Sequence, residues 1–190
     1  MKPIFALTIG LFSLVVSFNA QAGSLGTLVL GGTGCTAEAG EAQLIPAPGY
    51  RNRYKIPLQI AITKRADVSL VRQSCNFRLP VEVGANEKVV VSNVAQWVRL
   101  GASANTQVKT NLEIFLTGTR GNPLTTEVKA LDKPSRLFQT VRSEGIVAES
   151  ECGKSAIVAG NLSANAIGAS QATAAIGMLL LDVKIVSCEK

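Results

Sequence analysis

Residues 74–83 show the clearest alternation of apolar and polar positions in the chain. The odd-numbered positions are all apolar: Cys75, Phe77, Leu79, Val81 and Val83. Asn76, Arg78 and Glu82 lie between them, and a period of two predicts a strand with one buried and one solvated face. Pro80 is on the solvated side and cannot donate a backbone hydrogen bond, which indicates an edge strand or a bulge. We therefore expect this strand to anchor a sheet, with Cys75 directed into the core.

Other segments have the same alternation. Residues 54–62 are expected to form one strand, because Ile56, Leu58, Ile60 and Ile62 share one face. Further strands are predicted at residues 88–94, 107–117, 124–130, 155–167 and 170–185. Trp97 begins a short stretch, residues 97–100, that extends the sheet or caps the core. Residues 131–143 have a polar composition and are interpreted as a connection.

These strands predict an all-β fold, an antiparallel β-sandwich of one domain. Strand-length segments separated by glycine and proline turns are typical of such sandwiches. The alanine-rich segments after residue 155 would also suit helices by intrinsic propensity, but residues 179–185 alternate as a strand does. The expected core has ten members: Ile56, Leu58, Ile60, Phe77, Leu79, Val81, Leu112, Ile114, Leu181 and Val183.

The first 22 residues have the pattern of a secretory signal peptide. Lys2 supplies a positive start, residues 4–18 are almost wholly apolar, and Ala-Gln-Ala at 20–22 is the pattern that signal peptidase reads. A transmembrane anchor is the alternative, but the apolar run is shorter than the roughly 20 residues that span a bilayer. We expect cleavage near Ala22, a mature domain of residues 23–190 without an integral membrane segment, and a secreted or periplasmic location.

The chain has four cysteines: Cys35, Cys75, Cys152 and Cys188. An even number in an exported chain predicts two disulfides, for which three connectivities are possible. We favour Cys35–Cys75 with Cys152–Cys188, because shorter loops close more readily. Cys188 is out of phase with the strand before it, which requires a bulge or a frayed end. A zinc site is the competing interpretation, but the wide spacing and the absence of histidine argue against it, and we expect no metal or cofactor.

Cations are concentrated in the middle of the chain. Between residues 51 and 99 there are nine cations and only three acids. A one-sided basic surface attracts anionic polymers such as lipopolysaccharide, teichoic acid or nucleic acid. The alternative is that these are solvated outward residues of alternating strands. The candidate anionic-ligand face consists of seven residues: Arg51, Arg53, Lys55, Lys64, Arg65, Arg72 and Arg78. An anionic polymer of the cell envelope is the expected partner; the short aromatic and basic segment at 50–54 does not by itself indicate nucleic acid.

The sequence offers little support for catalysis. Without histidine there is no Ser-His-Asp or Cys-His arrangement, and oxidised cysteines provide no thiol nucleophile. Glu149 and Glu151 are the one local acid pair, and Lys154–Ser155 has no supporting motif. The glycine cluster at 31–34 lacks the Gly-Lys-Ser/Thr ending of a phosphate loop. We interpret the chain as a non-catalytic exported binding protein with no catalytic residues; the alternative is a hydrolase or inhibitor acting on envelope polymers.

The contexts of the four cysteines resemble a known family. They are Gly-Gly-Thr-Gly-Cys35, Ser-Cys75-Asn, Glu-Cys152-Gly-Lys-Ser155 and a terminal Cys188. In these motifs the chain resembles the secreted family termed domain of unknown function 4360, found in bacteria and fungi. The resemblance implies a small secreted β-rich domain and brings no activity or catalytic residue with it.

Overall fold

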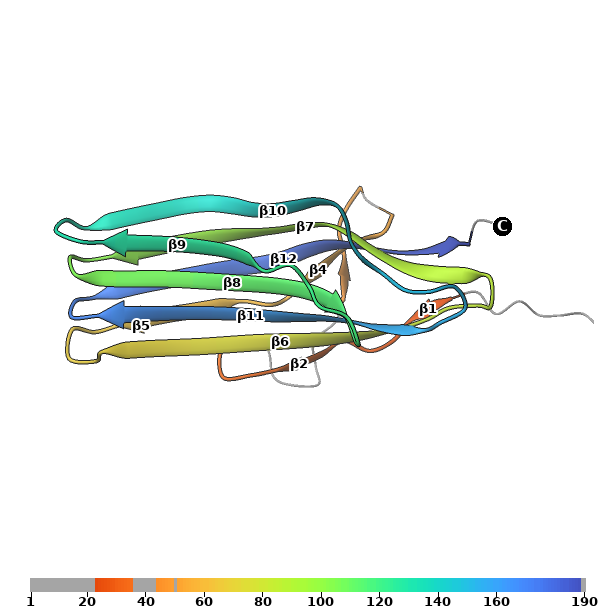
Figure 1. Ribbon diagram of the computed structural model, residues 1–190, viewed down its shortest axis with the longest axis horizontal. Helices are drawn as coiled ribbons and strands as arrows, with labels where there is room; N and C mark the ends of the chain where they lie inside the picture. Colours follow the sequence, from red (N-terminus) through yellow and green to blue (C-terminus); the bar gives the residue numbers. More distant parts are fainter. Residues whose placement is uncertain (1–22, 36–43, 50, 189–190) are drawn as a thin grey trace, which may run out of the picture.

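Two antiparallel sheets pack face to face as an elongated sandwich, in a computed structural model that describes residues 23–35, 44–49 and 51–188 (Figure 1). Sheet A contains β1 (Ser24–Leu25), β2 (Val29–Gly31), β6 (Leu70–Glu82), β8 (Thr106–Leu116), β9 (Leu124–Ala130) and β11 (Ala156–Gly168). Sheet B contains β3 (Ile45–Pro46), β4 (Arg53–Ile56), β5 (Ile60–Lys64), β7 (Glu87–Ala102), β10 (Ser135–Glu149) and β12 (Ala172–Ser187). The predicted all-β antiparallel sandwich is therefore confirmed. The predicted signal peptide lies outside the described residues.

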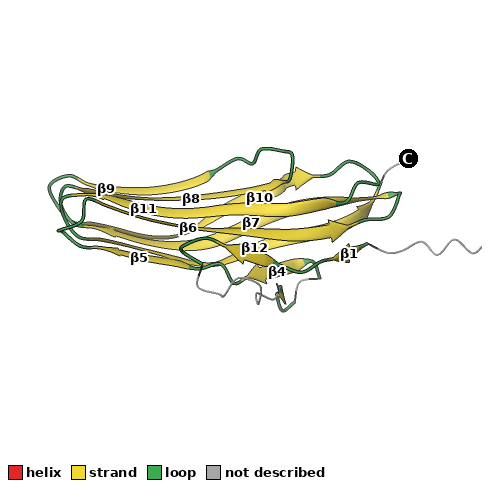
Figure 2. Cartoon of the chain, turned by 90° about the horizontal axis from the view of Figure 1, so that it is seen from below, coloured by secondary structure: helices red, strands yellow, loops and turns green. Residues whose placement is uncertain are grey.

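Long strands run the length of both layers (Figure 2). The order in sheet A is β1-β6-β11-β8-β9, with β2 also on β6. The order in sheet B is β10-β7-β12-β4-β3, with β5 also on β12. The last two strands in the sequence are therefore inner strands. β11 lies between β6 and β8, and β12 lies between β7 on one side and β4 and β5 on the other. No helix in the described part of the chain is long and apolar enough to cross a membrane.

The strand predicted around Phe77 corresponds to the second half of β6. Cys75, Phe77, Leu79 and Val81 are all at most 1% exposed, and the residues between them face solvent. On one side, β6 pairs only with the short strands β1 and β2. Neither of these two ladders includes Pro80. This explains why a residue without an N–H group is accepted there.

The predicted core is confirmed in full. All ten residues belong to one buried cluster between the sheets, which draws on both sheets. Aliphatic side chains fill most of it, and Phe77 is the one buried aromatic residue among those described. Its ring packs over Gly160 of β11, where a Cβ atom would lie 2.2 Å from Phe77 Cε1. Glycine at this position makes room for the ring.

The expected single strand at 54–62 is wrong in one respect. The structure divides it into β4 and β5, although Ile56, Leu58, Ile60 and Ile62 all remain buried. Pro57 follows β4 directly and has no N–H group for the ladder, which explains the interruption. Opposite this break, the ladder of β12 with β7 shifts register between Ile176 and Leu179.

The interpretation of residues 131–143 as a connection is wrong. Most of this segment belongs to β10, a strand that pairs with β7 from Ser135 to Glu149. No residue of β10 is fully buried, so the strand carries no strong apolar alternation. The strand β10 lies at an edge of sheet B, where solvent-exposed side chains are tolerated on both faces.

The two disulfides connect Cys35 to Cys75 and Cys152 to Cys188, as predicted. Their Cα atoms are 4.9 and 6.1 Å apart, and no described cysteine is free. The first joins the segment after β2 to the middle of β6. The second joins the turn after β10 to the residue that follows β12. Both are consistent with an extracytoplasmic protein.

Candidate ligand-binding face

The structure does not bring the seven predicted cations onto one face. Arg72 and Arg78 point outward from β6 in sheet A, whereas Arg53 and Lys55 are outward positions of β4 in sheet B. These two faces are on opposite sides of the sandwich. Three cations remain: Arg51 in an exposed bend, Lys64 at the end of β5, and Arg65 in an exposed ion pair with Asp67. The outward directions of Arg78 and Lys55 are confirmed, but the set is divided.

Lys64 is not available to a ligand. It is 0% exposed, and its Nζ donates hydrogen bonds to the carbonyl oxygens of Ser170, at 2.7 Å, and Arg65, at 3.1 Å. Alternation along β5 directs it into the sandwich rather than outward. The ammonium group therefore ties the β5 end to the turn before β12, a structural role that sequence pattern alone did not separate from a surface cation.

A different cluster lies on the outer face of sheet B. We call it the aromatic–arginine face, and it consists of five residues: Trp97 and Arg99 of β7, and Arg136, Phe138 and Arg142 of β10. Arg99 lies opposite Phe138 in the ladder, and Trp97, opposite Thr140, is two pairs further along. The two rings have centroids 6.2 Å apart and planes inclined at 46°. Trp97 is 42% exposed and Phe138 73%, which is unusual for large apolar rings.

The indole of Trp97 is fixed by the backbone beneath it. A Cβ atom at Gly177 of β12 would lie 1.9 Å from two atoms of the indole, so only glycine permits this close approach. Gly177 sits in the register shift between Ile176 and Leu179, and its carbonyl oxygen accepts a hydrogen bond from Gln96 Nε2 at 3.0 Å. The bulge and the glycine thus seat the ring on the sheet with much of its surface in solvent.

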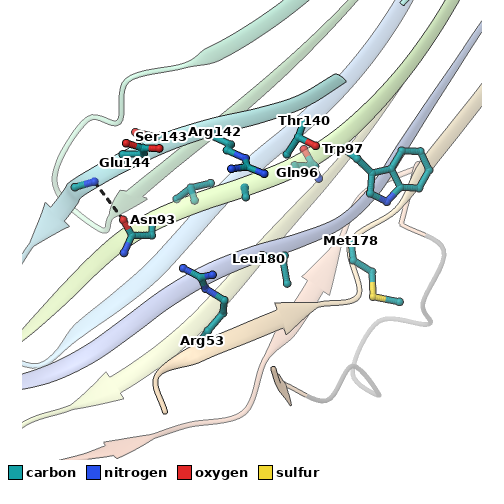
Figure 3. A pocket seen from close by; sticks show the side chains of 13 residues that line it. Arg53, Asn93, Gln96, Trp97, Thr140, Arg142, Ser143, Glu144, Met178 and Leu180 are labelled. Carbon is teal, nitrogen blue, oxygen red and sulfur yellow. Dashed lines mark hydrogen bonds between the residues drawn. The ribbon is translucent and has the colours of Figure 1, made fainter. Parts of the chain in front are cut away.

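Two hollows flank this aromatic pair. One, of about 800 Å³, is lined by Trp97, Arg142, Asn93, Met178 and Arg53. In the close-up, Arg142 and Arg53 reach toward it from opposite sides, and Trp97 and Met178 stand at one end (Figure 3). The other hollow, of about 960 Å³, is lined by Phe138 and these further residues: Arg99, Arg136, Thr63 and Thr173. Both open on the same side of sheet B.

The three arginines of this face lack an ion-pair partner in the part of the chain that the structure describes. Arg99, Arg136 and Arg142 are exposed, and none forms an ion pair with any residue that the structure describes. The acids nearby are Glu144, which lines the rim of the first hollow, and Asp182, which is bound to Arg53. The face therefore combines apolar ring surface with exposed guanidinium groups that no described acid pairs.

A polar network supports the floor beside the first hollow. Arg53 Nε donates to Asp182 Oδ1 at 2.6 Å, and Asn93 Nδ2 donates to Asp182 Oδ2 at 2.8 Å. Burial works to raise the pKa of Asp182, but the hydrogen bonds from Arg53 and Asn93 outweigh it and hold the pKa below its ordinary value. Asn93 adopts a positive φ of 50° within β7, and its Oδ1 accepts a hydrogen bond from the backbone N–H of Gly145 in β10. Asp182 thus joins β4, β7 and β12, with β10 held through Asn93.

Replacing Asp182 with asparagine should lower the free energy of unfolding by about 1–3 kcal/mol at neutral pH, because charged hydrogen bonds to Arg53 are lost. The folded-state pKa of Asp182 is depressed, so its contribution is complete above the ordinary value near pH 4 and disappears as pH falls through the lowered value. Urea unfolding at several pH values should show the two proteins converging below about pH 4. Lys88→Gln, which breaks an exposed pair with Glu149, serves as control and should cost less than about 1 kcal/mol. A constant difference down to pH 2.5 would contradict the assignment.

The acid pair considered for catalysis is engaged elsewhere. Glu149 forms an ion pair with Lys88 at 2.9 Å, and Glu151 pairs with Lys154. The hydrogen bond and charge of Lys154 lower the pKa of Glu151, whereas a glycosidase acid needs a raised pKa. No cluster of three or more potential metal-ligating side chains occurs among the described residues.

The sequence signal for this face is the alternation of outward residues in β7 and β10. Trp97 and Arg99 alternate outward with the buried Val98 and Leu100, and Arg136 and Phe138 repeat the spacing. The pairing of β10 with β7 is what brings the two patterns together. The prediction of a connection at residues 131–143 leaves no strand to pair with β7 there, so it does not bring Arg136 and Phe138 beside Trp97.

The chain matches no protein-family model and no curated protein. Among solved structures it is similar to TmCBM61 in complex with β-1,4-galactotriose, at 14% identity over 83% of this chain and 88% of that chain, with a TM-score of 0.29. A CBM4 structure has 12% identity over 84% of this chain and 94% of that chain, with a TM-score of 0.23. Similarity this low carries no argument about ligand or role.

Proposed function

We propose that this chain is a non-catalytic exported protein that binds an anionic polymer of the cell envelope or extracellular matrix. The observation that carries the proposal is the aromatic–arginine face, where three arginines that have no ion-pair partner among the described residues surround two exposed rings. Arginine matches carboxylate and phosphate groups through paired hydrogen bonds, and its weak hydration lowers the cost of bringing them together. The rings add apolar contact area between the charges.

The arrangement suits an extended ligand more than a small molecule. Arg136 and Arg142 are six residues apart on β10, which corresponds to about 20 Å at the roughly 3.3 Å rise of a strand. The two hollows lie on either side of the aromatic pair and are open to solvent along the sheet. A polymer lying along β7 and β10 would contact both hollows and both arginine positions.

Because the attraction is electrostatic, the affinity for the polymer should fall as the salt concentration rises. We expect wild-type protein to be retained on immobilised anionic polymer at low ionic strength and to elute as salt shortens the screening length toward about 8 Å. Changing Arg99 and Arg142 to glutamine should weaken retention roughly tenfold or more, since guanidinium groups at the centre of a contact dominate its affinity.

The matched control removes the same charge from the other side of the sandwich. Arg72→Gln with Arg78→Gln changes two exposed cations of sheet A, so the net charge is identical but the aromatic–arginine face is intact. Retention of this variant should equal that of the wild type. Equal loss in both double variants, or no retention of wild type on any anionic polymer, would overturn the proposal.

A further inference from the structure

We infer that the polymer is an acidic polysaccharide, a chain of sugar rings bearing carboxylates, bound lengthwise along β7 and β10. This inference rests on the proposed function and narrows it to one class of polyanion. Three features of the face carry it: a flat ring surface, exposed threonine hydroxyl groups beside it, and arginines on both sides of the rings.

The ring surface comes first. Trp97 lies on the backbone at Gly177 and presents its other side to solvent, with Phe138 inclined against it. Such a platform packs against the C–H face of a sugar ring, which is apolar and roughly flat. The rings of Trp97 and Phe138 are inclined at 46° and close together, so they do not form two parallel platforms for successive nucleobases. This geometry favours one sugar ring over a stack of bases.

Hydroxyl-binding groups surround the platform. Thr140 lies opposite Trp97 and faces the first hollow, and the second hollow is bordered by Thr63 and Thr173 of β5 and β12. Short donors and acceptors of this kind suit the hydroxyl groups that a sugar presents around its ring.

The spacing of the cations separates this ligand from a polyphosphate. Nucleic acids and teichoic acids carry a charge on every phosphate, and proteins neutralise them with closely spaced cations. Here Arg142 is separated from Arg99 and Arg136 by the aromatic pair, with uncharged Thr140 between on β10. Guanidinium groups at the two ends of an apolar centre, Arg142 at one and Arg99 with Arg136 at the other, suit a polymer whose carboxylates are separated by sugar rings.

The test measures binding of the full mature chain to three uronate polymers, namely polygalacturonate, alginate and hyaluronate. Each is compared with the same polymer after reduction of its carboxylates to alcohols, which keeps the rings and removes the charge. At least one acidic polymer should bind roughly tenfold or more tightly than its reduced form. Trp97→Ala should weaken that binding by a similar factor, while Trp97→Phe, which keeps a ring, should retain most of it. Thermal unfolding of each variant checks that the sandwich is intact.

A second variant guards against a folding artefact at Trp97. Gly177→Ala leaves the tryptophan in place but puts a Cβ atom where the indole lies, so the ring must move off its seat. We expect the same loss of binding to the acidic polysaccharide from this variant. Preserved binding in a folded Gly177→Ala protein would contradict the role of the seated ring.

Two comparison ligands separate failure of this inference from failure of the proposed function. Inorganic polyphosphate has charge without rings, and a single-stranded oligonucleotide has charge with bases. If polyphosphate binds as tightly as the uronates and Trp97→Ala has no effect, the anionic-polymer proposal stands and the polysaccharide inference falls. If the oligonucleotide alone binds in a Trp97-dependent way, the ligand is nucleic acid and the inference is overturned. Binding to none of the polymers overturns both.

Discussion

Phe77→Ala should destabilise the protein by about 3–5 kcal/mol, the largest single-residue effect that we expect. The Phe77 side chain is 1% exposed and fills the space above Gly160, between β6 and β11. Truncation removes the burial of a large ring and leaves a cavity that rigid sheets cannot close. Urea unfolding followed by far-ultraviolet circular dichroism measures the loss.

The neighbouring residue supplies a control for this experiment. Arg78 is on the same strand and points the opposite way, so Arg78→Ala should change stability by less than about 0.5 kcal/mol. Gly160→Ala adds a sharper test, because its new Cβ overlaps Phe77 in the wild type but has more room when residue 77 is alanine. The two substitutions should therefore couple favourably in a double-mutant cycle. Additive losses would show that the Phe77–Gly160 contact is not formed.

Removing the Cys35–Cys75 disulfide should cost about 2–5 kcal/mol. The bond closes a loop with a sequence separation of 40, and its loss enlarges the unfolded ensemble. We suggest replacing both cysteines with alanine, because Cys75 is 0% exposed and a buried serine would add an unsatisfied hydroxyl. Chemical unfolding under non-reducing conditions measures the change.

A thiol titration of the denatured, unreduced wild type checks the premise. It should find no free cysteine, and peptide mapping should recover both bonds. Free thiol in the wild type, or a double variant as stable as the parent, would contradict this role for the bond.

The sequence predicted those parts of the fold in which one strand face is buried and the other is wet. Phe77 and its alternate neighbours show this clearly, because their period of two already separates core from solvent. The same principle failed for β10, whose residues are partly or fully exposed on both faces. An edge strand of this kind is specified by its pairing with the neighbouring strand rather than by its own pattern. The pattern of one segment does not reveal which strand it pairs with.

The candidate face was missed for a related reason. Counting cations along the chain grouped Arg53 with Arg78, although strand order places them on opposite sides of the sandwich. Trp97 and Phe138 are 41 positions apart in sequence and become neighbours only when β10 pairs with β7. The position of the indole depends further on a bulge in β12. The alternation of apolar and polar residues along β12 does not predict that bulge.

Two inferences from the sequence remain predictions. The signal peptide at residues 1–22 lies outside the described residues, and the resemblance to the domain of unknown function 4360 family rests on short cysteine contexts. Both accord with two disulfides, and N-terminal sequencing of exported protein would test cleavage after Ala22.

The positions of β11 and β12 have a consequence for biogenesis. In sheet A β6 joins β8 through β11, and in sheet B β7 joins β4 and β5 through β12, and both connecting strands follow all of these in the chain. Before β11 and β12 are made, the ladders of β7 with β10 and of β8 with β9 can form, but neither sheet is complete. Most pairings are also distant in sequence, which delays folding further. The order of strands thus delays completion of both sheets until β11 and β12 have left the ribosome.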